Sequence, residues 1–160
     1  MLGIKLICVG KMKENHYITA MREYEKRLSG LCNLEICELG EYRLPANPSQ
    51  SEIAIGLERE AAEIEKQLPK GCFAVAMCIE GQRLSSEALA ELLLKYTVEG
   101  GSRICFIIGS SFGLADSIKQ RCQLLLSMSE MTFPHHLARV MLAEQLYRAM
   151  SITEGGKYHK

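Results

Sequence analysis

Two loops rich in small and hydroxylic residues each follow an apolar run in the last third of the chain. The run Arg103–Ile108 stops at Gly109-Ser-Ser-Phe-Gly113, and the run 124–126 is followed by Ser127-Met-Ser-Glu-Met-Thr-Phe-Pro-His-His136. Parallel α/β sheets bind ligands outside the carboxyl ends of their strands, where such loops lie. Glycine directly after a strand lets the backbone approach a ligand closely, although a plain turn explains the G-x-x-x-G spacing equally well. These loops are the first candidates for a ligand site.

The same loops can be compared with a dinucleotide fingerprint. Glu130 follows Gly109 by 21 residues, where a nicotinamide-dependent oxidoreductase would use an acidic residue to hold a ribose. The required G-x-G-x-x-G spacing, however, would put glycine at the positions of Ser111 and Leu114. The spacing argues against this class of enzyme, which is kept as an alternative.

Adjacent histidines close the second loop. His135 and His136 could suggest a metal, but neighbours on a helix point about 100° apart, and no carboxylate or cysteine completes a usual ligand spacing. Pro134 suits the first turn of a helix, so the residues before it can offer free backbone groups. We therefore expect no metal, and a structural or substrate-orienting role for both histidines.

Two further groups near the end of the chain could carry chemistry. Arg148 lies four residues after Glu144, a standard spacing for a helical ion pair. The alternative is that its guanidinium faces a pocket that must hold negative charge. The chain ends in Lys157-Tyr-His-Lys160, which gathers two cations, an aromatic ring and an imidazole where disorder is the rule. For this tail, composition leaves chance and function equally open.

Composition limits the class of protein. The 160 residues suit one domain, and no apolar run approaches the roughly 20 residues that span a bilayer. The N-terminus carries no secretory signal pattern, so we expect a cytoplasmic protein without a membrane. Seven cysteines without C-x-x-C spacing are expected to be buried, reduced thiols. With 19 basic and 19 acidic residues, any RNA must be recognised through shape, a local patch or a larger assembly.

The elements that must position these residues alternate along the chain. Apolar runs predict five strands, the second around Leu34 and Ile36 and the third ended by Gly81, and helical spacing predicts five helices between and after them. Ser85 or Ser86 is expected to cap the third helix, and Gly100-Gly101 to end it. This alternation predicts a single-domain α/β fold over residues 1–160, with a parallel sheet and helices on both faces.

The last predicted helix, residues 137–152, is apolar around most of its circumference. A helix that lies on one sheet shows a single apolar stripe. We therefore expect this helix to cover both its own core and a second subunit, which makes the protein a homodimer. A centrally buried helix is the alternative. The apolar residues are Leu137, Val140, Met141, Leu142, Leu146, Tyr147, Ala149 and Met150.

Several C-terminal blocks together resemble one family. The blocks are Ile108-Gly109 with Gly113-Leu114, then Leu126-Ser-x-Ser-x-Met-Thr-x-Pro-His135, then Glu144-Gln-Leu-Tyr-Arg-Ala149, and the closing Gly-x-x-Tyr-His. The chain is similar over its whole length to the small SPOUT methyltransferases that methylate N3 of a pseudouridine in bacterial large-subunit ribosomal RNA. Each block alone is weak, whereas the combination is specific.

The resemblance implies properties that periodicity does not. The C-terminal part, about 103–160, should form a deep trefoil knot that holds S-adenosylmethionine, and the enzyme should be a homodimer. Its partner should be ribosomal RNA, within the assembled ribosome. The positions that match the family's cofactor pocket are Met77, Gly109, Met128, Ser129, Glu130, Met131, Thr132 and Phe133. Ser110 stands where many relatives have a second glycine, and His136 where histidine is unusual.

The resemblance also assigns catalytic roles. Arg148 would stabilise the anion that develops on the uracil ring, and Tyr158 and His159 would close over the partner's cofactor and contact RNA. His159 would accept the N3 proton, because an unperturbed imidazole titrates near pH 6.5. The main alternative is a non-catalytic RNA- or nucleotide-binding module of the same fold.

Overall fold

The computed structural model describes residues 1–155 and 158, and its strands and helices alternate as predicted. Its elements, in chain order, are β1 (Gly3–Val9), α1 (Asn15–Leu28), β2 (Asn33–Leu39), α2 (Gln50–Gln67), β3 (Phe73–Arg83), α3 (Ser86–Val98), β4 (Arg103–Ile108), α4 (Asp116–Arg121), β5 (Leu124–Ser127) and α5 (His135–Thr153).

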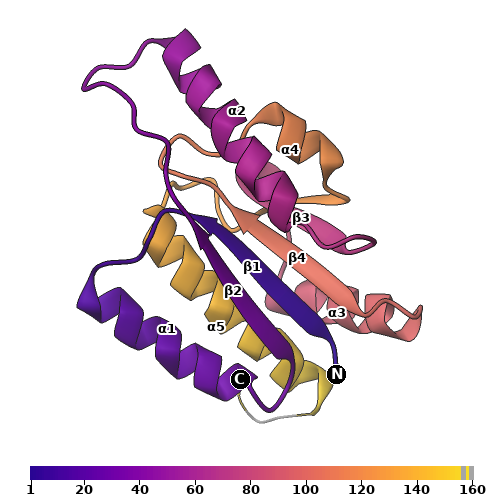
Figure 1. Cartoon of the computed structure of the whole chain (residues 1–160). Helices are drawn as coiled ribbons and strands as arrows, with labels where there is room; N and C mark the ends of the chain where they lie inside the picture. Colours follow the sequence, from indigo (N-terminus) through magenta and orange to yellow (C-terminus); the bar gives the residue numbers. More distant parts are fainter. Residues whose placement is uncertain (156–157, 159–160) are drawn as a thin grey trace.

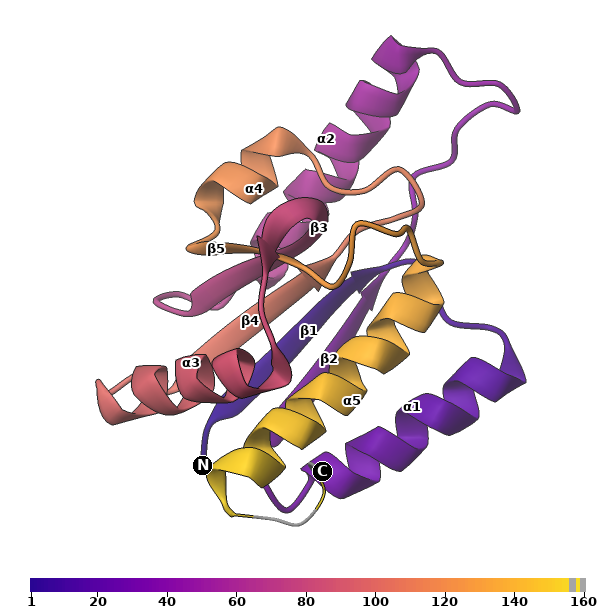
Figure 2. The ribbon, with the colours of Figure 1, turned by 180° about the vertical axis from the view of Figure 1, so that it is seen from behind.

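All five strands pair in parallel in the order β2-β1-β4-β3-β5. Helices α1, α3 and α5 cover one face, and α2 and α4 cover the other (Figures 1 and 2). The single-domain parallel α/β fold is therefore confirmed. The trefoil knot implied by the resemblance is a property of the chain path and stays a prediction.

The burial of a strand's residues depends on whether the strand lies in the middle or at the edge of the sheet. In β4, every residue after Arg103 is buried, as expected for a strand with helices on both faces. Strand β2 lies at the edge, and its exposure alternates: Leu34 and Ile36 point inward while Glu35 is exposed. Because β1, β4 and β3 are adjacent, their apolar side chains form the two cores on either side of the sheet.

Serine caps define where two helices begin. The Ser49 hydroxyl accepts from the Glu52 N–H at 3.2 Å, and the Glu52 carboxylate accepts from the Ser49 N–H at 3.1 Å, which forms a capping box. Ser85 accepts from the Ala88 N–H at 3.1 Å, so the first of the two predicted caps for α3 is confirmed. Gly100, at φ +91°, follows the C-terminus of α3 as expected.

Gly81 does not end the third strand, which corrects the prediction. Strand β3 continues to Arg83, and its pairing with β5 shifts register between Met77 and Gln82. A Cβ on Gly81 would lie 2.6 Å from the Leu125 carbonyl carbon. Glycine therefore serves here to let two strands approach closely beside an irregularity in the ladder.

Helix α5 lies between α1 and α3 on one face of the sheet (Figure 2). From His135 to Ile152 it has no fully exposed residue. Leu142 and Leu146 are buried in the core of their own chain, whereas Val140 and Met141 are partly exposed. Central burial thus accounts for much of the apolar character that suggested a dimer, and only part of the helix is left for a partner.

The seven cysteines are free thiols, as predicted, but four of them are only partly buried. Burial raises the pKa of Cys8 to about 12, and the pKa of Cys32 and Cys122 to about 11. These three thiols are therefore protonated and unreactive near neutral pH. Among residues 1–155 and 158, no helix is long and apolar enough to cross a membrane.

Candidate functional site

A cavity of about 620 Å³ opens at the carboxyl ends of β3, β4 and β5. Its size falls within the range of small-molecule sites, about 300–1,000 Å³. The walls come from three segments that are distant in sequence: residues 77–80 at the irregularity of β3, the loop after β4, and the loop between β5 and α5. The sheet order makes these strand ends neighbours, because β4 and β5 both pair with β3.

Most of the residues assigned to the cofactor by resemblance line this cavity. They come from all three walls, and their side chains are largely apolar or hydroxylic. They are Met77, Gly109, Met128, Ser129, Met131, Thr132 and Phe133.

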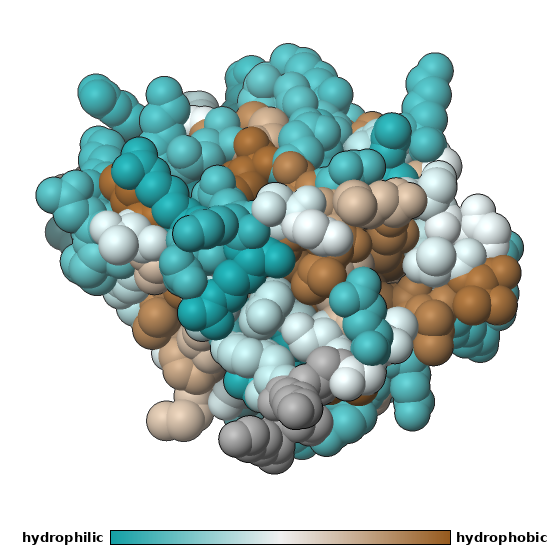
Figure 3. Space-filling model, turned by 90° about the horizontal axis from the view of Figure 1, so that it is seen from below, coloured by the Kyte–Doolittle hydropathy of each residue, from teal (hydrophilic) through white to brown (hydrophobic). Residues whose placement is uncertain are grey.

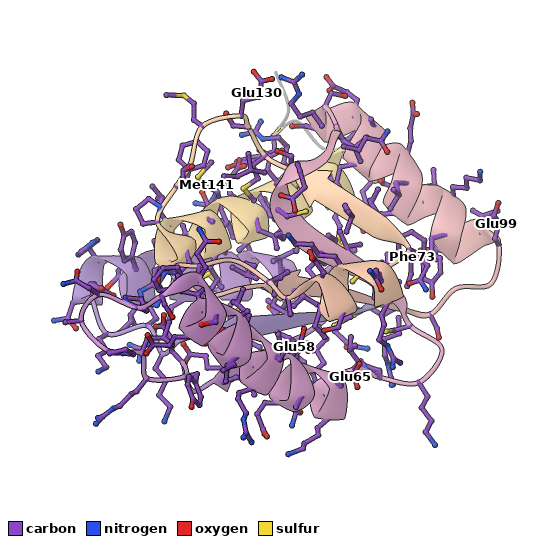
Figure 4. All side chains as sticks on the ribbon, turned by 90° about the horizontal axis from the view of Figure 1, so that it is seen from above. Glu58, Glu65, Phe73, Glu99, Glu130 and Met141 are labelled. Carbon is purple, nitrogen blue, oxygen red and sulfur yellow. The ribbon has the colours of Figure 1, made fainter. Side chains whose placement is uncertain are left out.

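Glu130 is the exception. Its side chain is 80% exposed and forms an ion pair with Arg83 at 3.5 Å, and it does not line the cavity. Figure 4 places it at the outer edge of the loop. The strand order β2-β1-β4-β3-β5 also differs from the 3-2-1-4-5-6 order of the dinucleotide-binding fold, which argues against the oxidoreductase alternative.

Gly109 is required by the shape of its own loop. The Gly113 N–H donates to the Ser110 carbonyl at 2.9 Å, and Gly113 has φ +87°. A Cβ on Gly109 would lie 2.2 Å from the Gly113 carbonyl oxygen, a distance that real Cβ atoms do not show. The sequence analysis expected a close approach between Gly109 and a ligand. The structure shows a close approach within the loop after β4, between Gly109 and Gly113.

Serine hydroxyls hold the loop between β5 and α5. The buried Ser127 hydroxyl donates to the Ser129 carbonyl at 2.9 Å, and the Ser129 hydroxyl accepts from the Met131 N–H at 3.0 Å. Met131 is left 72% exposed at the mouth of the cavity. The loop is therefore shaped by its own side chains and presents an apolar residue to the opening.

Residue-based prediction missed the polar part of the wall at β3. Glu80 lines the cavity and accepts from the Lys119 ammonium, which holds the pKa of the Glu80 carboxyl below its usual value. Cys78 also lines it, and burial raises the pKa of that thiol. Only their position at the end of the apolar run 72–79 could have indicated them in the sequence.

The two histidines occupy different places. His135 lines the cavity, and burial lowers its pKa. His136 points away to Glu14, with Nδ1 3.0 Å from the carboxylate oxygen. Among the described residues, no three potential metal ligands gather into a cluster.

Arg148 and Tyr158 lie together, but away from the cavity. The Arg148 Nη2 donates to the Glu144 carboxylate at 2.5 Å, and the Tyr158 hydroxyl donates to the same oxygen at 3.3 Å. The guanidinium stacks over the Tyr158 ring at 4.7 Å, and burial raises the pKa of Tyr158. Neither residue lines the cavity, and Arg148 is about 20 Å along α5 from His135 at a rise of about 1.5 Å per residue. His159 lies outside the described residues.

A groove of about 340 Å³ runs from the cavity toward this cluster. It shares Met77 and Met128 with the cavity and follows the outer face of α5 past Met141 to Glu144. The groove therefore joins the two predicted parts of the site on one surface of the molecule. Met141 is labelled on α5 in Figure 4.

Together, fold and site define a parallel α/β protein with a ligand cavity at the carboxyl edge of its sheet. A family model described as "Predicted SPOUT methyltransferase" matches residues 2–159. The chain belongs to the SPOUT methyltransferase family.

Proteins named "Ribosomal RNA large subunit methyltransferase H" are similar over the full length. One from Streptococcus equi subsp. zooepidemicus (strain MGCS10565) is 46% identical, and one from Streptococcus pyogenes serotype M12 (strain MGAS2096) is 44% identical. Both alignments cover 99% of this chain and 100% of the relative.

Solved structures share the fold at low identity. A probable methyltransferase from Bordetella pertussis Tohama I aligns with a TM-score of 0.59 at 15% identity, covering 93% of this chain and 95% of that one. A probable methylase family protein from Haemophilus influenzae Rd KW20 aligns with a TM-score of 0.58 at 15% identity, covering 100% and 72%.

Proposed function

We propose that this protein is an S-adenosylmethionine-dependent methyltransferase that methylates N3 of a pseudouridine in the large-subunit ribosomal RNA of bacteria. The observation that carries the proposal is the cavity, whose walls contain seven of the eight positions assigned to the cofactor. Family membership and the names of the full-length relatives support the same reaction and substrate class.

The cavity residues fit the proposed cofactor. Met77, Met131 and Phe133 supply apolar surface for an adenine ring, and the loops after β4 and β5 supply hydroxyls and backbone groups for the ribose and the amino-acid part. When bound, S-adenosylmethionine supplies a methyl group already activated by its sulfonium. The protein must therefore position the acceptor nitrogen and manage its proton.

The cluster at the end of α5 provides groups for that task. As the N3–H bond breaks, negative charge spreads onto the two carbonyl oxygens of the ring, and a guanidinium such as that of Arg148 stabilises it. His159 would accept the N3 proton, and the bound cofactor would supply the methyl group to N3 as its sulfur–methyl bond breaks and S-adenosylhomocysteine leaves. Tyr158 holds the guanidinium in place by stacking.

A homodimer completes the site. Arg148 is about 20 Å along α5 from the end that borders the cavity of the same chain, and Tyr158 packs beside it, so neither residue lines that cavity. The groove along α5 gives a second copy a surface on which its own Arg148 and tail lie over the first cavity. Each dimer then contains two composite sites.

Assembled ribosomes in the cytoplasm are the proposed substrate. The chain has no net charge, and hydrophilic and apolar residues are mixed on the face seen from below (Figure 3). Phosphate neutralisation alone would give such a protein little affinity for naked RNA. The folded ribosome supplies a shape that the dimer can recognise.

The direct test incubates the purified protein with S-adenosylmethionine labelled in its methyl group and with ribosomes from cells that lack the gene. Label is expected in large-subunit ribosomal RNA, on N3 of one pseudouridine located by nuclease digestion and mass spectrometry. Naked ribosomal RNA is the matched substrate and should be modified far more slowly. Binding of RNA without transfer of label would identify a non-catalytic RNA-binding module instead.

A further inference from the structure

A buried carboxylate links the cavity to a second loop. Glu60, on α2, is 7% exposed. Its Oε1 accepts from the Ser110 hydroxyl at 2.9 Å, and its Oε2 accepts from the Tyr42 N–H at 2.9 Å. Ser110 follows Gly109 in the cavity wall, whereas Tyr42 belongs to the connection between β2 and α2. One side chain therefore ties two loops at the same edge of the sheet.

This carboxylate has no cation beside it. In the described part of the chain, no ion pair includes Glu60, and burial raises its pKa. A buried carboxylate without a paired charge is expensive, so its neighbours must supply hydrogen bonds to both oxygens. A glycine at position 110 would leave Oε1 without its donor.

The surrounding contacts make the link rigid. A Cβ on Gly56, one turn earlier on α2, would lie 3.1 Å from the Tyr42 ring, so the loop rests directly on the helix. A second hydrogen bond also joins the loop after β4 to the loop after β2: the Ser111 hydroxyl donates to the Glu41 carboxylate at 3.2 Å. The loop after β4 is therefore held to α2 and to the loop after β2 through consecutive serines.

We propose that Glu60 is a positioning residue of the cofactor site: its carboxylate holds the Ser110 hydroxyl and thereby keeps the 109–113 loop in its binding conformation. The proposal rests on the proposed function, since the ligand it concerns is S-adenosylmethionine. Glu60 does not line the cavity itself and acts through the Ser110 hydroxyl. Without this bond, the loop loses a fixed anchor and must be ordered when the cofactor binds.

The same helix offers a matched control pair. Glu58 accepts from the Ser117 hydroxyl at 3.2 and 3.1 Å, which again joins α2 to the segment after β4. This pair is exposed and does not line the cavity, and Figure 4 labels Glu58 on α2. Glu58→Ala therefore removes a serine–glutamate bond of the same kind without touching the loop.

The experiment measures the Kd for S-adenosylmethionine by calorimetry for the full-length protein and its variants. Glu60→Ala and Ser110→Ala should each weaken binding about 10-fold, because the loop that they release must be ordered when the cofactor binds. Glu58→Ala should stay within about twofold. The double variant with Glu60→Ala and Ser110→Ala should bind no more weakly than Glu60→Ala alone, because each change breaks the same hydrogen bond.

Two further measurements separate positioning from a merely structural role. Glu60→Gln should bind almost as well as the wild type, since the amide can accept from Tyr42 and donate to the Ser110 oxygen. In the cofactor-free protein, hydrogen exchange should accelerate at the amides of residues 109–114 in Ser110→Ala, but not in Glu58→Ala. Ser110→Ala removes only a hydroxyl, so it keeps the test valid if Glu60→Ala does not fold.

Equal Kd values for Ser110→Ala and Glu58→Ala would overturn the inference, even if the unfolding midpoint of Ser110→Ala fell. Failure of the wild type to bind S-adenosylmethionine would overturn the proposed function, and this inference with it. The two failures are distinguishable, because the first leaves wild-type binding intact.

Discussion

At the scale of single residues, steric and electrostatic constraints gather around the loop after β4. Gly109 has no room for a side chain, and Ser110 supplies the hydroxyl that satisfies Glu60. Both residues precede a short segment that lines the cavity. Small changes here should therefore affect ligand binding more than comparable changes elsewhere on the surface.

Gly109→Ala should destabilise the protein by about 1–3 kcal/mol and weaken cofactor binding, because the new Cβ would overlap the Gly113 carbonyl. Denaturant unfolding and calorimetry measure the two effects. Gly40→Ala is the control, since a Cβ at Gly40 meets no atom within 4 Å. Equal stability of the two variants would contradict the tight loop.

Glu60 should make stability depend on pH in a defined direction. Burial raises its pKa in the folded state above the unfolded value of about 4.3. The folded state then binds the proton more tightly, so this group's contribution to stability falls as pH rises from about 4 through the folded pKa. Glu60→Gln should therefore gain stability relative to the wild type as pH rises from 4 to 8. Parallel stability curves from denaturant unfolding would show that the carboxyl titrates normally.

At the scale of elements, α5 is fixed to the sheet by one buried cation. Arg139 is 2% exposed; its Nη1 donates to the Glu38 carboxylate at 2.5 Å, and its Nη2 donates to the Gly10 carbonyl at 2.8 Å. Glu38 also accepts from the Met12 N–H at 2.8 Å. The first turns of α5, which follow the cavity loop, are thereby tied to the ends of β1 and β2.

Arg139→Ala should lower the free energy of unfolding by about 1–3 kcal/mol, because it leaves the buried Gly10 carbonyl without its donor and the partly exposed Glu38 carboxylate without its cation. Chemical denaturation measures the loss. Lys66→Ala removes an exposed ion pair with Glu63 and should cost at most about 1 kcal/mol. Similar losses for both variants would mean that the buried network contributes little.

At the scale of the whole molecule, the proposed homodimer rests on the separation of the two predicted parts of the site. The cavity lies at the N-terminal end of α5, and the Arg148–Tyr158 cluster lies toward its C-terminal end. Met141 and Leu142 both line the groove between the cavity and this cluster, but Leu142 is 1% exposed and belongs to the core, whereas Met141 is partly exposed. A test of the interface must therefore use Met141.

Met141→Glu should convert the proposed dimer into a folded monomer, because a carboxylate would be buried at the proposed interface without a partner. Light scattering gives the mass, and circular dichroism gives the fold. Ile55→Glu is the control, since Ile55 is 55% exposed on α2 across the sheet. A Met141→Glu protein that remains dimeric would exclude this face as the interface.

Mixed dimers test whether the tail acts across the interface. A subunit lacking residues 155–160, paired with a Gly109→Val subunit, keeps one intact cavity and one donated tail. Such dimers should recover up to half of the wild-type methyl transfer, although each homodimer is expected to be inactive. If the tail served its own subunit, the mixture would show no recovery.

Apolar periodicity predicted the type and order of the described strands and helices, and most of their approximate bounds, because it encodes which side of an element is buried. The sequence by itself also located the two loops at strand ends and, by resemblance, seven residues that line the cavity. The tertiary structure decided what depends on distant partners. Ser110 meets Glu60 across 50 positions, and Arg139 meets Glu38 across 101. Glu130 turns outward and Gly81 stays within β3 for the same reason. Side-chain direction and strand register depend on which segments pack together, and local sequence patterns do not contain that information.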